Sequence, residues 1–142
     1  LSGASEDVIS MVKTYGELVG VAFQLADDVI DIVSDGKTSG KTRGTDLREG
    51  VPTLPTILLD RAVAAGDESA REVRALLDAD LSSDEALEAA VEALAAHPVT
   101  QEAWQIAYDW ADRAIEAIAP LPESTAKAAL ESFAHAVVHR EG

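Results

Sequence analysis

Three aspartates that lie close together in the chain, Asp27, Asp28 and Asp31, have the residue type and spacing of a metal-binding turn. At about 100° per residue, Asp31 lies about 40° from Asp27 around a helix axis, and Asp28 about 60° beyond Asp31. The carboxylates would share one side of one turn, where like charges cost an isolated helix roughly 0.2–0.5 kcal/mol per pair. Mg²⁺ would offset this repulsion, because it takes one or two carboxylates and fills its other positions with water and substrate phosphates. The alternative is a solvated acidic turn without a ligand.

Two glycines lie on the same side of this expected helix. Gly16 and Gly20 fall within about 20° of Asp27, and each costs a helix interior about 1 kcal/mol relative to alanine. Phe23 and Gln24 flank them. Two interpretations stay open. The glycines form a trough for a ligand tail, lined by Phe23 and with Gln24 as a polar anchor, or they allow another helix to approach closely.

The helix that must carry these residues is predicted to run from about residue 6 to about residue 34. Its opposite side is apolar, which predicts a broad buried stripe. The stripe consists of Leu18, Val21, Ala22, Leu25, Val29, Ile32 and Val33.

A polar loop is expected over residues 35–52, because glycines at positions 36, 40, 44 and 50 disfavour regular structure there. This segment holds four of the 11 basic residues of the chain, Lys37, Lys41, Arg43 and Arg48. Cations beside a Mg²⁺–carboxylate site are what a bound diphosphate requires. The alternative is an ordinary solvated loop whose basic residues offset nearby acids.

The remaining sequence predicts helices only. They are expected to begin near residues 52–55, 67, 82, 99 and 123, and to end near 66, 78, 97, 119 and 139. Ser82 and Glu85 form a predicted capping box, and His97-Pro98 is expected to separate two helices. With abundant alanine and only 4% aromatic residues, the chain is predicted to be an all-α domain, a helical bundle without an internal linker.

Composition excludes several kinds of partner. The 26 acidic and 11 basic residues give a net charge of −15, which disfavours nucleic acid and anionic membrane surfaces. No apolar run approaches the length of a membrane span. The absence of cysteine excludes disulfides and thiolate metal sites and is typical of a cytoplasmic protein.

Three segments together resemble the trans-isoprenyl (polyprenyl) diphosphate synthases. Residues 23–31 resemble the second aspartate-rich motif of that family, FQ-x-x-DD-x-x-D, and residues 40–47, Gly-Lys-Thr-Arg-Gly-Thr-Asp-Leu, follow at the family's spacing. Residues 49–55 resemble its E-G-K-x-T-L-P segment. The resemblance covers the whole chain and implies the isoprenoid synthase fold. It also implies a head-to-tail prenyltransferase, usually a homodimer, that joins isopentenyl diphosphate to an allylic diphosphate with Mg²⁺.

The resemblance also implies roles for single residues. Asp27 would ligate Mg²⁺, with Asp28 and Asp31 as its partners. Gln24 and Lys41 would bind the allylic diphosphate. The role implied for Asp46 is to orient Lys41 or a metal-bound water.

Two departures from the family pattern change these expectations. Val51 stands where the family commonly has a second diphosphate-binding lysine, so that contact is lost or taken over by Arg48. The first aspartate-rich motif and the isopentenyl diphosphate-binding residues of the family are absent. Residues 1–142 are therefore interpreted as the C-terminal portion of a synthase, expected to be inactive alone.

The sequence leaves two other functions open. A terpene cyclase of the same fold also uses aspartate-rich motifs, but the Gly-Lys-x-x-Gly-Thr-Asp and Gly-Val-Pro-Thr-Leu-Pro segments favour the synthase. A non-catalytic synthase subunit or helical interaction domain is the other alternative, and it would bind a partner that carries the first aspartate-rich motif.

Overall fold

A computed structural model describes residues 6–33 and 43–139, and it confirms the all-α prediction. Across these two ranges the regular structure is helical, without a β-strand. None of the described helices is both long enough and apolar enough to cross a bilayer. The helices are α1 (Glu6–Val33), α2 (Thr45–Glu49), α3 (Leu54–Ala64), α4 (Glu68–Asp78), α5 (Asp84–Ala96), α6 (Pro98–Ala117) and α7 (Thr125–His139).

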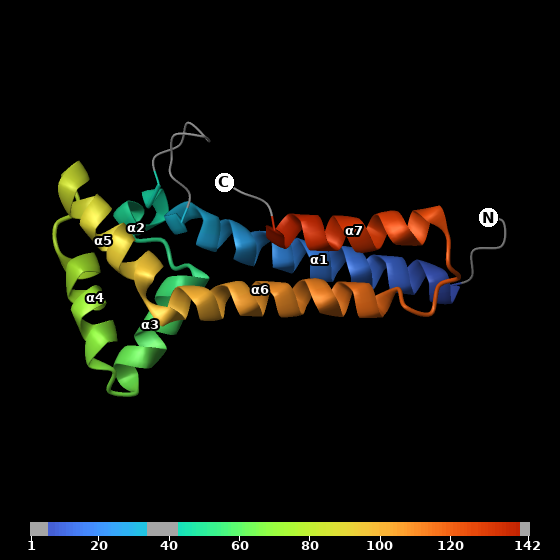
Figure 1. Cartoon of the computed structure of the whole chain (residues 1–142), viewed down its shortest axis with the longest axis horizontal. Coiled ribbons are helices and arrows are strands. Elements are labelled where there is room, and N and C mark those ends of the chain that lie inside the picture. Colours follow the sequence, from blue (N-terminus) through green and yellow to red (C-terminus); the bar gives the residue numbers. More distant parts are fainter. Residues whose placement is uncertain (1–5, 34–42, 140–142) are drawn as a thin grey trace. The chain divides into compact units, whose positions relative to one another are not determined.

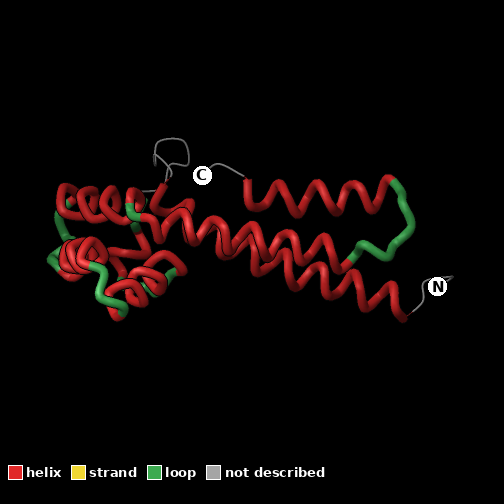
Figure 2. The backbone as a smooth tube through the Cα atoms, turned by 60° about the horizontal axis from the view of Figure 1, so that its bottom comes forward, coloured by secondary structure: helices red, strands yellow, loops and turns green. Residues whose placement is uncertain are grey.

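The described chain divides into two compact units. The first contains α1 up to Ala26, α6 from Gln105 onward, and α7. Within it the three helices run alongside one another, and α6 is antiparallel to both α1 and α7 (Figures 1 and 2). Their buried positions are mostly small, since Ala22, Ala26, Ala107, Ala111, Ala114 and Ala134 are at most 1% exposed. The abundant alanine of the sequence therefore serves close helix packing.

Tyr15 joins α1 to α7 in this unit. Its hydroxyl donates a 2.6 Å hydrogen bond to the backbone oxygen of Leu130. The ring is buried, and burial raises the pKa of the Tyr15 hydroxyl above its usual value. This polar contact helps to fix the register of α1 relative to α7.

Lys127 closes the connection between α6 and α7. Its buried ammonium donates to the backbone oxygens of Ala119 and Leu121, both at 2.9 Å, and to Oε1 of Glu123, also at 2.9 Å. An ammonium has three donors, so each has a partner in the described structure. The two carbonyls follow the C-terminus of α6, where a cation is favourable.

Replacing Lys127 by methionine should lower the free energy of unfolding by roughly 2–3 kcal/mol, because two carbonyls lose a charged donor while the side-chain volume stays similar. The measurement is urea denaturation followed by circular dichroism. Glu123→Gln is the matched control: Glu123 is 86% exposed, so its arm of the cluster should contribute at most about 0.5 kcal/mol. Equal losses in the two variants would show that the carbonyl contacts do not stabilise the connection.

The second unit contains the end of α1 from Asp27, helices α2 to α5, and the start of α6 up to Trp104. Its core is formed by fully or almost fully buried aliphatic side chains from several helices. They are Val29, Ile32, Leu58, Leu59, Leu87, Val91 and Leu94. Helix α4 packs against both α3 and α5, and α2 packs against α5 (Figure 1).

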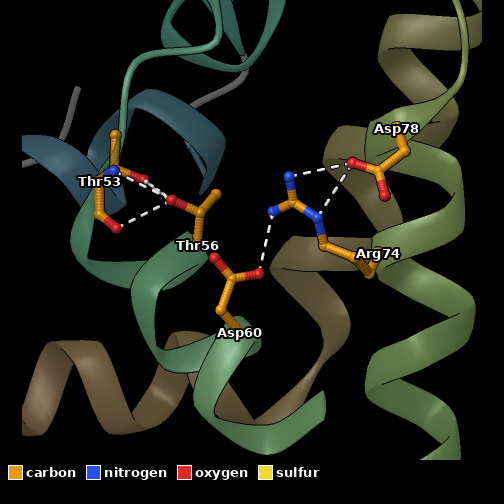
Figure 3. A network of polar contacts seen from close by, with 5 residues as sticks. All are labelled: Thr53, Thr56, Asp60, Arg74 and Asp78. Carbon is orange, nitrogen blue, oxygen red and sulfur yellow. Dashed lines mark hydrogen bonds and ion pairs between the residues drawn. The ribbon is translucent and has the colours of Figure 1, made fainter. Parts of the chain in front are cut away.

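Arg74 ties α4 to α3 at the surface of this unit. Its guanidinium lies between Asp60 of α3, at 3.2 Å, and Asp78 one turn along α4, at 3.0 Å (Figure 3). Nearby, the backbone N–H of Thr53 donates to Oγ1 of Thr56 at 3.0 Å, which satisfies an N–H at the start of α3. Pro55 lies in the first turn of α3, as predicted.

Two local predictions were wrong. Residues 45–49 form the short helix α2 inside the segment predicted to be a loop. Gly44 caps its start and Gly50 caps its end, with left-handed φ values of 81° and 72°. The glycines therefore delimit regular structure there. The N-cap of α5 is Ser83 rather than Ser82, and its hydroxyl accepts from the N–H of Ala86 at 3.1 Å. Ser82 instead donates its N–H to the Asp80 carboxylate at 2.9 Å, which holds it ahead of the helix.

The predicted apolar stripe of α1 is narrower than expected. Ala22, Val29 and Ile32 are buried, but Val21 and Val33 are 37% and 39% exposed. The predicted break at His97-Pro98 is confirmed, since His97 caps the end of α5 and α6 begins at Pro98. The His97 ring is buried, and its Nδ1 accepts from the N–H of Val99 at 3.2 Å.

Candidate metal and diphosphate site

The three aspartates of the acidic turn have different environments. Asp27 is exposed, Asp28 is half-buried, and Asp31 is only 7% exposed. The helical spacing predicted a shared side, but it could not show that other elements cover the last turn of α1. Asp27 and Asp28 are therefore the carboxylates most open to a ligand from solvent.

Asp28 connects the acidic turn to the start of α3. Its Oδ2 accepts a 3.1 Å hydrogen bond from the backbone N–H of Leu54, the first residue of α3. A carboxylate at this position satisfies a helix N–H and is stabilised by the positive end of the helix dipole. Asp28 thus has a structural role that its place in the motif did not predict.

Gly44 connects the same turn to α2 and α5. Its N–H donates a 2.9 Å hydrogen bond to the backbone oxygen of Asp31. Its φ of 81° lies in the left-handed region, and a Cβ there would overlap Cγ2 of Val91 and lie 3.2 Å from Cδ1 of Leu87. Backbone conformation and close packing against α5 therefore both require glycine.

Gly44→Ala should lower the free energy of unfolding by about 3 kcal/mol, because it adds a steric overlap to the cost of a left-handed residue. Gly50→Ala is the matched control. Gly50 has a similar φ of 72°, but a Cβ there meets nothing within 4 Å, so only about 1–2 kcal/mol should be lost. Urea denaturation of both variants measures the difference. A loss at Gly44 no larger than that at Gly50 would contradict the close contact with Val91.

The two arginines of the predicted basic loop are directed at α5. Arg43 forms a two-pronged ion pair with Glu88, and its Nη2 lies 3.7 Å from Glu92. This arginine is the main reason that the pKa of the Glu88 carboxyl lies below its usual value. Arg48 donates to the backbone oxygen of Leu81 and to Asp84, both at 3.0 Å.

For these two arginines the contacts favour the alternative interpretation, in which basic residues of the loop offset nearby acids. Acidic side chains that repeat at every fourth residue of α5 form ion pairs with both arginines. In the described structure, Arg48 contacts the backbone oxygen of Leu81, just before α5, and the carboxylate of Asp84 in α5. These contacts give no support for its replacing the lysine absent at position 51.

Of the other predicted site residues, the structure describes some but not all. Lys37 and Lys41 lie outside the described residues. Asp46 lies in the first turn of α2 and is half-buried. Phe23 and Gln24 are exposed residues of α1.

The glycines of α1 have open surroundings. A Cβ at Gly16 or Gly20 would meet no atom within 4 Å. Close helix packing by the described residues therefore does not account for these two glycines, and space beside α1 remains at both positions.

Among residues 6–33 and 43–139, no three Asp, Glu or His side chains converge as a metal-ligand set. The exposed carboxylate of Asp27 and the adjacent Asp28 nevertheless fit Mg²⁺, because this ion needs only one or two carboxylates and completes its shell with water or phosphate oxygens. The donor atoms are hard oxygens, as Mg²⁺ prefers.

Sequence reasoning missed the residues that hold the acidic turn in place, above all Glu88 and Leu54. A sign of the first was present in the sequence. Asp84, Glu88 and Glu92 recur at intervals of four residues, and like charges on one helix face need cations nearby. The contact of Leu54 is made by its backbone, which no side-chain pattern shows.

The structure defines an all-α protein in which an acidic turn is held between helix termini, and sequence comparison identifies its family. The profile of the Polyprenyl synthetase family matches residues 1–94. Nonaprenyl diphosphate synthase of Mycobacterium tuberculosis is 38% identical over 141 residues, which cover 99% of this chain and 41% of that protein. The chain belongs to the polyprenyl synthetase family.

Comparison with solved structures supports the same family assignment. Geranylgeranyl pyrophosphate synthase from Corynebacterium glutamicum, crystallised with calcium and isoprenyl diphosphate, superposes with a TM-score of 0.82 at 37% identity. Polyprenyl synthase from Caulobacter crescentus, crystallised with the same ligands, gives 0.83 at 30% identity. Each match covers 99% of this chain and 42% of the other. The fold is the isoprenoid synthase fold, and the chain spans about two fifths of the length of these relatives.

Proposed function

We propose that this chain supplies one metal–diphosphate site of a polyprenyl diphosphate synthase that joins isopentenyl diphosphate to an allylic diphosphate. The observation that carries the proposal is the acidic turn of α1. Its carboxylates are graded from exposed Asp27 to buried Asp31, and Leu54 and Gly44 hold it from two other elements. Relatives crystallised with calcium and an isoprenyl diphosphate support this function.

In the proposed mechanism, a bound Mg²⁺ would act as a Lewis acid that stabilises the departing diphosphate. Asp27 and Asp28 would hold the metal. Asp31, the third carboxylate of the motif, would support Asp27 and Asp28 from the buried end of the turn, and Asp46 would orient Lys41 or a metal-bound water. The hydrogen bond from Leu54 to Asp28 fixes one oxygen of that carboxylate before the metal arrives, which lowers the ordering cost of binding.

Gln24 and Lys41 would bind the diphosphate oxygens, and Phe23 would contact the hydrocarbon next to the allylic carbon. The space beside Gly16 and Gly20 is compatible with an apolar chain lying along α1. This is the interpretation in which the two glycines form a trough for a ligand tail. We propose that the complete enzyme is a homodimer, as the family resemblance implies.

The chain should bind Mg²⁺ more tightly when inorganic diphosphate is present, by about tenfold, because phosphate oxygens complete the coordination shell. Isothermal titration calorimetry of Mg²⁺ into the chain, with and without diphosphate, measures this coupling. By linkage, diphosphate must gain the same factor from Mg²⁺, which provides an internal check. The same Mg²⁺ affinity in both titrations would sink the proposal.

A further inference from the structure

The last turn of α1 carries Asp31 but contains no cation of its own. The final four carbonyls of a helix have no partner within the helix, and a positive charge is favourable beside them. The last turn of α1 holds no basic residue. Whatever holds this turn in the described structure must therefore come from another element.

Arg43 and Gly44 provide that hold. The N–H of Gly44 donates to the oxygen of Asp31 at 2.9 Å. Nη1 of Arg43 makes a longer contact, 3.5 Å, with the oxygen of Ile32. Two successive carbonyls at the end of α1 are thus engaged by two successive residues, and the guanidinium lies at the negative end of the helix dipole.

Glu88 of α5 fixes the guanidinium in this position. Both of its carboxylate oxygens accept from Arg43, at Nε and Nη2, and Nη1 is left for Ile32. A guanidinium is planar with its donors in a rigid fork, so a two-pronged pair on one edge sets the direction of the other edge. The Arg43 side chain is 18% exposed and that of Glu88 is 51% exposed, so the geometry of the pair, rather than its energy in isolation, is what directs the guanidinium.

We infer that Glu88 is a positioning residue for the carboxylate site: through Arg43 it holds the last turn of α1, and hence Asp31 and its neighbours, in the orientation that binds metal and diphosphate. Glu88 is 57 residues beyond Asp31 and lies outside all three segments that resemble the family motifs. The inference rests on the proposed function, because it concerns the same site.

The chain offers a matched control on the same helix. Asp84 lies one turn before Glu88 and pairs with Arg48 at 3.0 Å. That pair joins α5 to α2, and the contacts that Arg48 makes with Leu81 and Asp84 do not involve α1. Losing the charge at position 84 therefore removes an ion pair of α5 with the same basic segment, although a more exposed one, without releasing the end of α1.

The experiment compares wild type, Glu88→Gln and Asp84→Asn. We expect Glu88→Gln to weaken Mg²⁺ binding in saturating inorganic diphosphate by about tenfold, the scale of losses when residues that orient metal ligands are changed. Asp84→Asn should stay within about twofold of wild type. Amide hydrogen exchange at residues 31–33 and 44, measured by NMR, should speed up in Glu88→Gln alone.

Each other result has a definite meaning. Faster exchange with unchanged affinity would make Glu88 a purely structural residue and overturn the inference. Equal affinity losses in both variants would overturn it as well, since the effect would then not pass through α1. If wild type itself shows no Mg²⁺ binding with diphosphate, the proposed function fails and takes the inference with it.

A second variant covers the case in which Glu88→Gln does not fold. Arg43→Lys keeps the charge but replaces the fork by one ammonium, which cannot hold Glu88 and Ile32 together. We expect about a threefold loss of Mg²⁺ affinity with an unchanged urea midpoint. Affinity equal to wild type would overturn the inference.

Discussion

The purified chain, supplied with Mg²⁺, isopentenyl diphosphate and an allylic primer, should form no elongated product. Ionising an allylic diphosphate requires the departing charge to be neutralised on several sides, and such electrostatic stabilisation is usually the largest single catalytic contribution. The family resemblance implies two aspartate-rich motifs, and residues 23–31 correspond to the second of them. Both arginines that follow the turn are bound to carboxylates of α5.

The assay is incorporation of labelled isopentenyl diphosphate into the primer, with the Asp27→Ala chain as the background control. A second assay adds the part of a related synthase that this chain does not match, about three fifths of its length. Product formed only in this mixture would show that the chain needs residues of that part for activity. Incorporation by the chain alone above the Asp27→Ala background would show that this sequence needs no second acidic cluster.

In an intact synthase that carries these residues, Asp27→Ala should lower kcat by at least about a hundredfold, a typical loss when one direct stabiliser of developing charge is removed. Asp31→Ala should cost much less at saturating Mg²⁺. The structure supplies the reason, because Asp27 is exposed to an incoming metal whereas Asp31 is 7% exposed and lies within the packed end of α1.

The comparison uses kcat of both variants over a range of Mg²⁺ concentrations, so that weaker metal binding is separated from slower chemistry. Asp112→Ala, an exposed aspartate of α6, controls for a general change of charge and should leave kcat unchanged. A larger loss at Asp31 than at Asp27 would mean that the buried carboxylate, rather than the exposed one, contacts the metal.

Local patterns in the sequence were enough for the helices and for the family. The apolar and alanine-rich periodicity predicted the long helix α1 and five further helices to within a few residues of their observed ends. These features depend on residues close in sequence, where helical spacing and caps act directly. The acidic turn and its motif spacing were visible for the same reason.

The environment of each site residue was decided by tertiary structure. Helical spacing placed Asp27, Asp28 and Asp31 on one side, but in the folded chain one is exposed, one receives the N–H of Leu54 and one is buried. Backbone donors such as Leu54 and Gly44 leave no mark in a side-chain pattern.

The basic loop shows the same limit most clearly. The sequence showed how many cations the loop contains but not which groups they contact. The carboxylates that bind Arg43 and Arg48 lie 45 and 36 residues further along the chain. The five-residue helix α2 was likewise not predicted, because so short a segment has only a weak local preference for helix. Burial of Leu47 and the packing of α2 against α5 stabilise it in the folded chain. Contacts between residues distant in sequence decided both features, and only the folded chain brings those residues together.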